Sequence, residues 1–206
     1  MIFLVTLYIT RHGQTEWNVA KRMQGWSDSP LTEKGHQDAK KLAHKLKNTP
    51  FSAVYISPSG RTVQTAEILL KEREVTTILD EDLREINAGE WQGMTLSNIE
   101  STFPEQYVAY YEQPEQFKPT SGESFHDVEK RVLSVLNRII EADPEGNVLI
   151  VTHSVVKKLL INYFKGHPLS SLWDPPFIHG TSLTVVEIDN DGQAILKIVG
   201  DTSHFE

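Results

Sequence analysis

The side chains best suited to chemistry in this sequence are two histidines, each of which follows an apolar run. Arg11 and His12 come after residues 2–9, and His153 comes after residues 147–152. Runs of this length and composition predict buried strands. Ligands of open α/β sheets bind beyond the carboxyl ends of the strands, so we expect these side chains to lie where a ligand would bind.

A third apolar run repeats the arrangement. Residues 53–57 predict a short strand, and Arg61 follows it after a proline and a glycine. Three strands would then bring two histidines and two arginines to one edge of one sheet. A single histidine is more often structural than catalytic, but several cationic or protonatable groups together suit a polyanion, of which phosphate is the commonest.

Four short motifs occur in an order that resembles a known family. They are Arg11-His12-Gly13, Ser57-Pro58 with Arg61, Leu83-Arg84-Glu85, and Val151-Thr152-His153. Together they resemble the histidine phosphatase superfamily, the phosphoglycerate mutase-like group, over nearly the whole chain from Leu7 to about His204. Within that superfamily, the sequence is most similar to the small bacterial broad-specificity phosphatases.

The resemblance implies phosphoryl transfer to a histidine of the protein, followed by hydrolysis. His12 would be the neutral nucleophile, with one ring nitrogen held by a backbone carbonyl. Arg11, Arg61 and His153 would bind the phosphoryl oxygens as charge spreads over them. Glu85 would protonate the leaving alkoxide and then take a proton from water. The substrate would be a small phosphorylated metabolite.

The family also uses the loop after the first strand in its phosphate pocket. This implies substrate-binding roles for Asn18, Gln24 and Gly25, although from spacing alone Asn18 and Gln24 could equally cap turns. Ser154 stands where many relatives carry glycine, and its hydroxyl would either add a donor or crowd the pocket. The full set of expected substrate-binding residues is Arg11, Asn18, Gln24, Gly25, Arg61, Glu85 and Ser154.

Several alternatives remain open. A phosphoglycerate mutase would need a 2,3-bisphosphoglycerate primer, but residues 86–91 lack the basic side chains that would hold a second phosphate, which favours a hydrolase. An alpha-ribazole-phosphate-type phosphatase is another form of the hydrolase. A zinc site at His12 and His153 is opposed by the nearby arginines, and a non-enzymatic phosphate binder would have lost the nucleophile or the acid. We therefore expect no metal and no cofactor.

The composition indicates which classes of binding partner and which cellular compartment to expect. The net charge of −8 argues against nucleic acid, which a basic surface would favour. The chain has no cysteine, which fits a reducing cytoplasm and excludes a disulfide framework. Residues 1–5 are apolar but carry no basic leader, and Arg11 comes too soon for a membrane span. We expect a cytoplasmic protein without membrane association; the sequence does not indicate its oligomeric state.

The alternation of apolar runs and helical periods predicts a three-layer α/β/α sandwich with a mostly parallel sheet. Helices are expected after Thr32, around Arg61, from Ser124 to about Glu141 and immediately beyond His153, where the helix N-terminus would favour an anion. Residues 182–188 and 194–199 alternate as a hairpin and predict one antiparallel edge strand. Residues 14–26 show no period and predict a loop. Residues 92–123 predict a helical insertion over the active site, within a single domain of residues 1–206.

Overall fold

A six-stranded sheet forms the centre of the protein. The structure is a computed structural model that describes residues 3–71, 73–142 and 145–206. The strand order is β3-β2-β4-β1-β5-β6. The strands are β1 (Phe3–Arg11), β2 (Ala53–Ile56), β3 (Thr76–Leu79), β4 (Gly146–Thr152), β5 (Leu183–Asp189) and β6 (Ala194–Asp201).

Strands β1 to β4 run parallel to one another, as predicted. The predicted hairpin is confirmed at the edge of the sheet, where β5 pairs antiparallel with both β1 and β6. In the described part of the chain, β5 is the strand that opposes the others, and β6 lies outside it. Strands β1 and β4 are therefore central; Val5, Leu7 and Ile9 of β1 are buried, as are residues 148–151 of β4.

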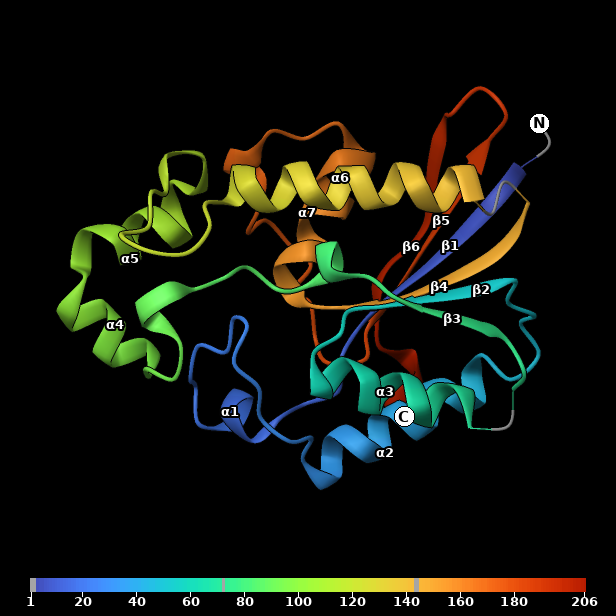
Figure 1. Ribbon diagram of the computed structural model, residues 1–206, viewed down its shortest axis with the longest axis horizontal. Coiled ribbons are helices and arrows are strands. Elements are labelled where there is room, and N and C mark those ends of the chain that lie inside the picture. The colour runs from blue at the N-terminus through green and yellow to red at the C-terminus, as the bar shows by residue number, and fades with distance from the viewer. Residues whose placement is uncertain (1–2, 72, 143–144) are drawn as a thin grey trace.

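Helices cover both faces of the sheet (Figure 1), so the predicted α/β/α architecture is confirmed. Helices α2 (Glu33–Lys45) and α3 (Gly60–Leu70) pack together on one face. Helices α6 (Phe125–Ala142) and α7 (Ser154–Lys165) pack together on the other. In α6 the buried residues recur at a spacing of three or four, which is the period of an amphipathic helix, whereas α7 is buried at every position from Val155 to Asn162.

Side-chain caps confirm the predicted starts of α2 and α6. The Thr32 hydroxyl accepts a hydrogen bond from the Gly35 N–H at 3.0 Å. At the start of α6, the Ser124 N–H donates to the Asp127 carboxylate at 2.9 Å, and the Asp127 N–H donates to the Ser124 hydroxyl at 3.3 Å. These reciprocal bonds satisfy N–H groups that a helix leaves unpaired at its first turn.

The loop predicted over residues 14–26 contains a short helix, α1 (Glu16–Val19). Periodicity cannot reveal a helix of a single turn. Reciprocal caps define it instead: the Asn18 N–H donates to the Thr15 hydroxyl, and the Thr15 N–H donates to the Asn18 side-chain oxygen. The expectation of an entirely irregular loop was wrong for this turn.

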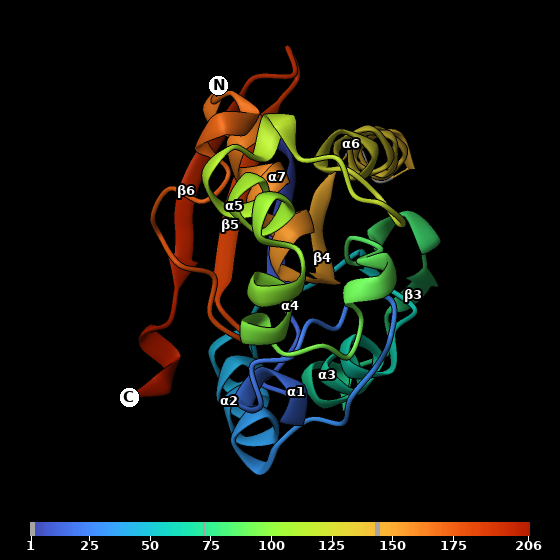
Figure 2. The same cartoon turned by 90° about the vertical axis from the view of Figure 1, so that its left-hand side faces the viewer.

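The segment predicted to be helical between β3 and α6 contains α4 (Leu96–Thr102) and α5 (Pro104–Glu112). Figure 2 shows these two helices in front of the end of the sheet, away from the layers that cover its faces. An aromatic cluster anchors them, in which the ring of Tyr110 lies 5.5 Å from Trp91 and 4.8 Å from Phe125. Short 3₁₀ helices occupy Glu81–Leu83, Gly89–Trp91, Pro114–Gln116, Leu169–Ser171 and Ser203–Phe205.

Candidate active site

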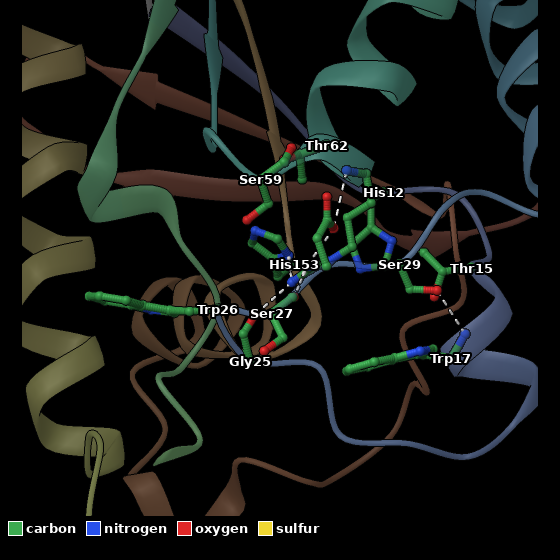
Figure 3. Close-up of polar contacts among 12 residues, drawn as sticks. His12, Thr15, Trp17, Gly25, Trp26, Ser27, Ser29, Ser59, Thr62 and His153 are labelled. Carbon is green, nitrogen blue, oxygen red and sulfur yellow. Dashed lines mark hydrogen bonds and ion pairs between the residues drawn. The ribbon is translucent and has the colours of Figure 1, made fainter. Parts of the chain in front are cut away.

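Sheet hydrogen bonds extend beyond the strand ends and fix the residues that follow them. The His12 N–H donates to the Thr152 carbonyl at 2.9 Å, and the Ser57 N–H donates to the Val151 carbonyl at 3.0 Å. The predicted meeting of strand ends is thereby confirmed: the rings of His12 and His153 lie edge to face, 5.3 Å apart. Figure 3 shows the two imidazoles next to one another.

The His12 ring has a defined tautomer. Its Nδ1 lies 2.7 Å from the Gly13 carbonyl oxygen, which only accepts hydrogen bonds, so Nδ1 carries the proton and Nε2 keeps its lone pair. The ring is buried, and burial together with the charges of Arg61 and Arg11 holds its pKa well below the ordinary 6.5. His12 is therefore neutral at physiological pH, as a nucleophilic imidazole must be.

His153 has the opposite tautomer. Arg61 Nη2 lies 3.1 Å from His153 Nδ1, and a guanidinium only donates, so Nδ1 is the acceptor. The proton is then on Nε2, which donates to the Ser57 hydroxyl at 2.7 Å. Burial, followed by the charge of Arg61, lowers the pKa of His153 well below 6.5. Both of its ring nitrogens are bonded within the protein.

Arg61 lies in the first turn of α3 and connects His153 to the loop after β1. Nη1 donates to the Ser27 carbonyl at 2.8 Å and to the Asp28 carboxylate at 2.9 Å. Nη2 donates to the Gly25 carbonyl at 2.8 Å as well as to His153. The side chain is only 1% exposed, and its buried Nε–H has no partner among the described residues. Sequence reasoning missed Asp28, because no motif marks it.

Glu85 lies at the N-terminus of α7. Its Oε2 accepts hydrogen bonds from the N–H groups of Ser154, at 3.1 Å, and Val155, at 3.4 Å. Positive helix termini favour anions. The sequence predicted an anion at this terminus, and in the structure a protein carboxylate occupies it. Arg84, the neighbouring cation, pairs with Glu81 instead.

The remaining expected residues also meet at this site. Asn18 caps α1 through its side-chain oxygen and still lines the cavity, so both of its expected roles are open to it. Gln24 is buried with its side-chain oxygen unpaired among the described residues. Gly25 has a φ of +55°, and a Cβ there would lie 2.9 Å from the Ala88 nitrogen. Ser154 lines the same cavity.

One cavity of about 510 Å³ joins these groups to an apolar wall. Its polar lining includes Arg11, His12, Arg61 and Glu85. The apolar and aromatic side chains that line it are Met23, Ile86, Leu96, Tyr110, Tyr111, Val155, Trp173, Pro175, Phe177 and Ile178. Residues 173–178 were not anticipated from the sequence; the Ile178 carbonyl also accepts a hydrogen bond from Arg11 Nη1 at 2.7 Å.

The described residues contain no group of three or more histidine, cysteine, aspartate or glutamate side chains arranged to hold a metal ion. His153 uses both ring nitrogens within the protein, and two arginines lie beside the histidines. The site is thus built around fixed cationic side chains. Such groups complement an anion with several oxygen atoms, and the free Nε2 of His12 adds a nucleophile.

The fold is of the α/β class, and the site is suited to phosphoryl transfer. Comparison with known sequences agrees with this assignment. The sequence profile of the histidine phosphatase superfamily (branch 1) matches residues 7–201. The chain therefore belongs to the histidine phosphatase superfamily, which confirms the resemblance drawn from its motifs.

Individual relatives carry several names. Phosphoserine phosphatase 1 of Hydrogenobacter thermophilus is 29% identical over 195 residues, covering 95% of this chain and 92% of the relative. The adenosylcobalamin/alpha-ribazole phosphatase of Salmonella typhimurium is 35% identical, covering 81% and 83%. The solved structure of Bacillus stearothermophilus YhfR is 46% identical, covers 98% of this chain and all of its own, and has a TM-score of 0.95. Other relatives are named probable phosphoglycerate mutases.

Proposed function

We propose that this protein hydrolyses small phosphomonoesters through a phosphohistidine at His12. The observation that carries the proposal is the tautomer of His12: the Gly13 carbonyl holds the Nδ1 proton, so Nε2 presents a lone pair in a cavity that also contains arginines and a carboxylate. A neutral imidazole with a fixed orientation is suited to attack phosphorus.

The other residues of the site have separate proposed roles in the reaction. Arg11 and Arg61 stabilise the negative charge that spreads over the phosphoryl oxygens in the transition state. Glu85 protonates the leaving alkoxide and later takes a proton from the attacking water. The family resemblance implied that His153 binds phosphoryl oxygens, but both of its ring nitrogens are bonded to Ser57 and Arg61, so we propose instead that it keeps Arg61 in place through the bond to Nδ1. Asn18, Gln24, Gly25 and Ser154 line the cavity and are proposed to contact the substrate.

The cavity supports a substrate whose alcohol part is largely apolar. Tyr110, Tyr111 and Trp173 line it together with the aliphatic side chains named above. Burying apolar surface of the substrate against such a wall contributes roughly 25 cal/mol per Å². We expect kcat/KM to be higher for aryl and long-chain alkyl phosphates than for small polar phosphates such as 3-phosphoglycerate.

A phosphoglycerate mutase is the second candidate, because relatives carry that name and because Arg22 and Lys158 also line the cavity. Incubation of the protein with 3-phosphoglycerate and a 2,3-bisphosphoglycerate primer separates the two. We expect free phosphate to form much faster than 2-phosphoglycerate. Faster formation of 2-phosphoglycerate would establish the mutase.

The proposal itself is tested by trapping the intermediate. Brief mixing with ³²P-labelled substrate and quenching in alkali should leave label on the wild-type protein and none on His12→Ala. Label that survives acid but not alkali would indicate a seryl ester and contradict the assignment.

The proposal includes a metal-independent reaction in the cytoplasm. Cationic side chains already supply the charge stabilisation that a metal ion provides in other phosphatases. Dialysis against a chelator should therefore leave turnover unchanged, and a tenfold loss that zinc or magnesium restores would contradict this.

The absence of cysteine supports a reducing compartment. No helix among the described residues has both the length and the apolar character needed to span a bilayer.

A further inference from the structure

An ion pair between Arg131 and Glu123 lies against the segment that carries Glu85. Arg131 Nε donates to Glu123 Oε1 at 2.8 Å, and Nη2 donates to Glu123 Oε2 at 2.9 Å. The two side chains are only 14% and 19% exposed. A bidentate pair of this kind fixes the plane of the guanidinium as well as its position.

The other N–H groups of Arg131 bind backbone carbonyls around the proposed general acid. Nη1 donates to the carbonyls of Asp82 and Arg84, both at 2.7 Å, and Nη2 donates to the carbonyl of Glu85 at 3.0 Å. A guanidinium has five N–H donors. All of them are used here, and three of the bonds end on residues 82–85.

Glu123 extends the contact to the next residues of the segment. Its Oε2 accepts a hydrogen bond from the Asn87 N–H at 2.8 Å, and its own N–H donates to the Asn87 carbonyl at 2.9 Å. Gly122 permits this close approach: its φ is +94°, and a Cβ there would lie 2.1 Å from the Asn87 carbonyl oxygen. The backbone on both sides of Glu85 is therefore held by one charged pair.

Residues 84–88 form neither helix nor strand, so their backbone polar groups depend on such side-chain partners. We infer that Arg131 is a positioning residue, which holds the backbone of Glu85 so that its carboxylate stays in the cavity and on the N-terminus of α7. This inference rests on the proposed role of Glu85 as general acid. It assigns to α6 a direct part in placing that acid.

The leaving group of the substrate reveals whether Arg131 acts through Glu85. Alkyl alcohols leave as poor alkoxides and need a proton in the transition state, whereas p-nitrophenolate leaves with little help. The quantity to compare is kcat/KM, which reports the steps up to alcohol release. A misplacement of about 1 Å can cost about 100-fold. We expect Arg131→Met to lower kcat/KM about 30- to 100-fold with n-butyl phosphate but less than about threefold with p-nitrophenyl phosphate.

Arg138→Met is the matched control, because Arg138 lies on the same helix and pairs with Asp80 and Asp82 of the same segment. Those pairs are exposed and do not reach Glu85, so this variant should change the two rates by similar small factors. Combining Arg131→Met with Glu85→Gln should add no further loss with n-butyl phosphate beyond that of Glu85→Gln alone.

Equal losses of kcat/KM for the two substrates in Arg131→Met would overturn the inference, since they would indicate general damage to the fold. If Arg131→Met does not fold, as judged by circular dichroism, Arg131→Lys carries the same comparison. Lysine keeps the charge but cannot span the carboxylate and three carbonyls, so the same unequal loss is expected. If Glu85→Gln shows the unequal loss and neither Arg131 variant does, the general acid stands and its positioning by Arg131 is refuted. If Glu85→Gln itself shows none, both assignments fail.

Discussion

The ends of β1 and β4 carry the same residue type, but the structure uses the two histidines differently. Each ring is buried, and each has a pKa well below the ordinary value because of burial and nearby arginines. Within the described parts of the chain, the His12 ring is hydrogen-bonded only at Nδ1, to the Gly13 carbonyl. His153 gives both nitrogens, to Arg61 and to Ser57.

The difference shows how partners assign roles to chemically identical side chains. A carbonyl beside Nδ1 forces the proton onto that atom and leaves Nε2 reactive, whereas a guanidinium beside Nδ1 forces the proton to the other nitrogen. In the proposed mechanism, the end of β1 therefore supplies the nucleophile, and the end of β4 supplies the histidine that holds Arg61 in place.

The largest expected effect is that of His12→Ala, because this variant removes the atom that we propose to bond to phosphorus. We expect kcat/KM for p-nitrophenyl phosphate to fall roughly 10⁴-fold or more, with loss of the alkali-stable label. Steady-state kinetics and the trapping experiment measure the two effects. Activity within about tenfold of wild type would mean that the nucleophile lies elsewhere.

A smaller effect is expected at the end of β4. His153→Ala removes the acceptor for Arg61 Nη2 but leaves the nucleophile in place. We expect a fall in kcat/KM of about 100-fold, as for loss of one oriented stabilising group, and the protein should still take up label from substrate. A loss as large as that of His12→Ala, with no label, would erase the distinction between the two strand ends.

Loss of the Ser57 hydroxyl, which holds His153, should lower kcat/KM less than loss of His153 itself. Ser57→Ala removes the hydroxyl that accepts the His153 Nε2 proton and leaves that buried N–H unpaired, at a cost of about 1–3 kcal/mol. We expect kcat/KM to fall about tenfold, since the ring and the bond to Arg61 remain. Ser59→Ala is the control, because the buried Ser59 hydroxyl has no partner in the described residues. Equal effects of the two variants would deny Ser57 a role.

The smallest expected effect is on the pH dependence of the free energy of unfolding, which is measured without reference to catalysis. The pKa values of His12 and His153 are lowered on folding, so the unfolded chain binds more protons once the pH falls below about 6.5. Each histidine should then reduce the free energy of unfolding by up to about 1.4 kcal/mol per pH unit until its folded pKa is reached. Urea unfolding between roughly pH 7 and pH 5.5 should show a shallower slope for His12→Gln than for wild type. Parallel slopes would mean that folding does not lower the pKa of His12.

The strands, two helix starts and the family could be predicted from the sequence, because the signals for them are local. Apolar runs predicted the strands. Thr32 predicted the start of α2, and Ser124 with Asp127 predicted the start of α6. The position of His12 directly after a strand predicted that it lies at the edge of the sheet. The apolar period indicated which side of α6 is buried, but it did not reveal that α7 is buried at every position from Val155 to Asn162. The family followed from four motifs that keep their order along the chain.

The tertiary structure decided what each of these residues does, because the deciding partners lie far away along the chain. The tautomer of His153 depends on Arg61 and Ser57, and Asp28 holds Arg61 from a loop without a motif. The carboxylate of Glu85 meets the start of α7 only when β4 and the segment after β3 lie next to each other. Proton positions follow from which donor or acceptor faces each atom, and a sequence states the residue types without stating which of them will face one another.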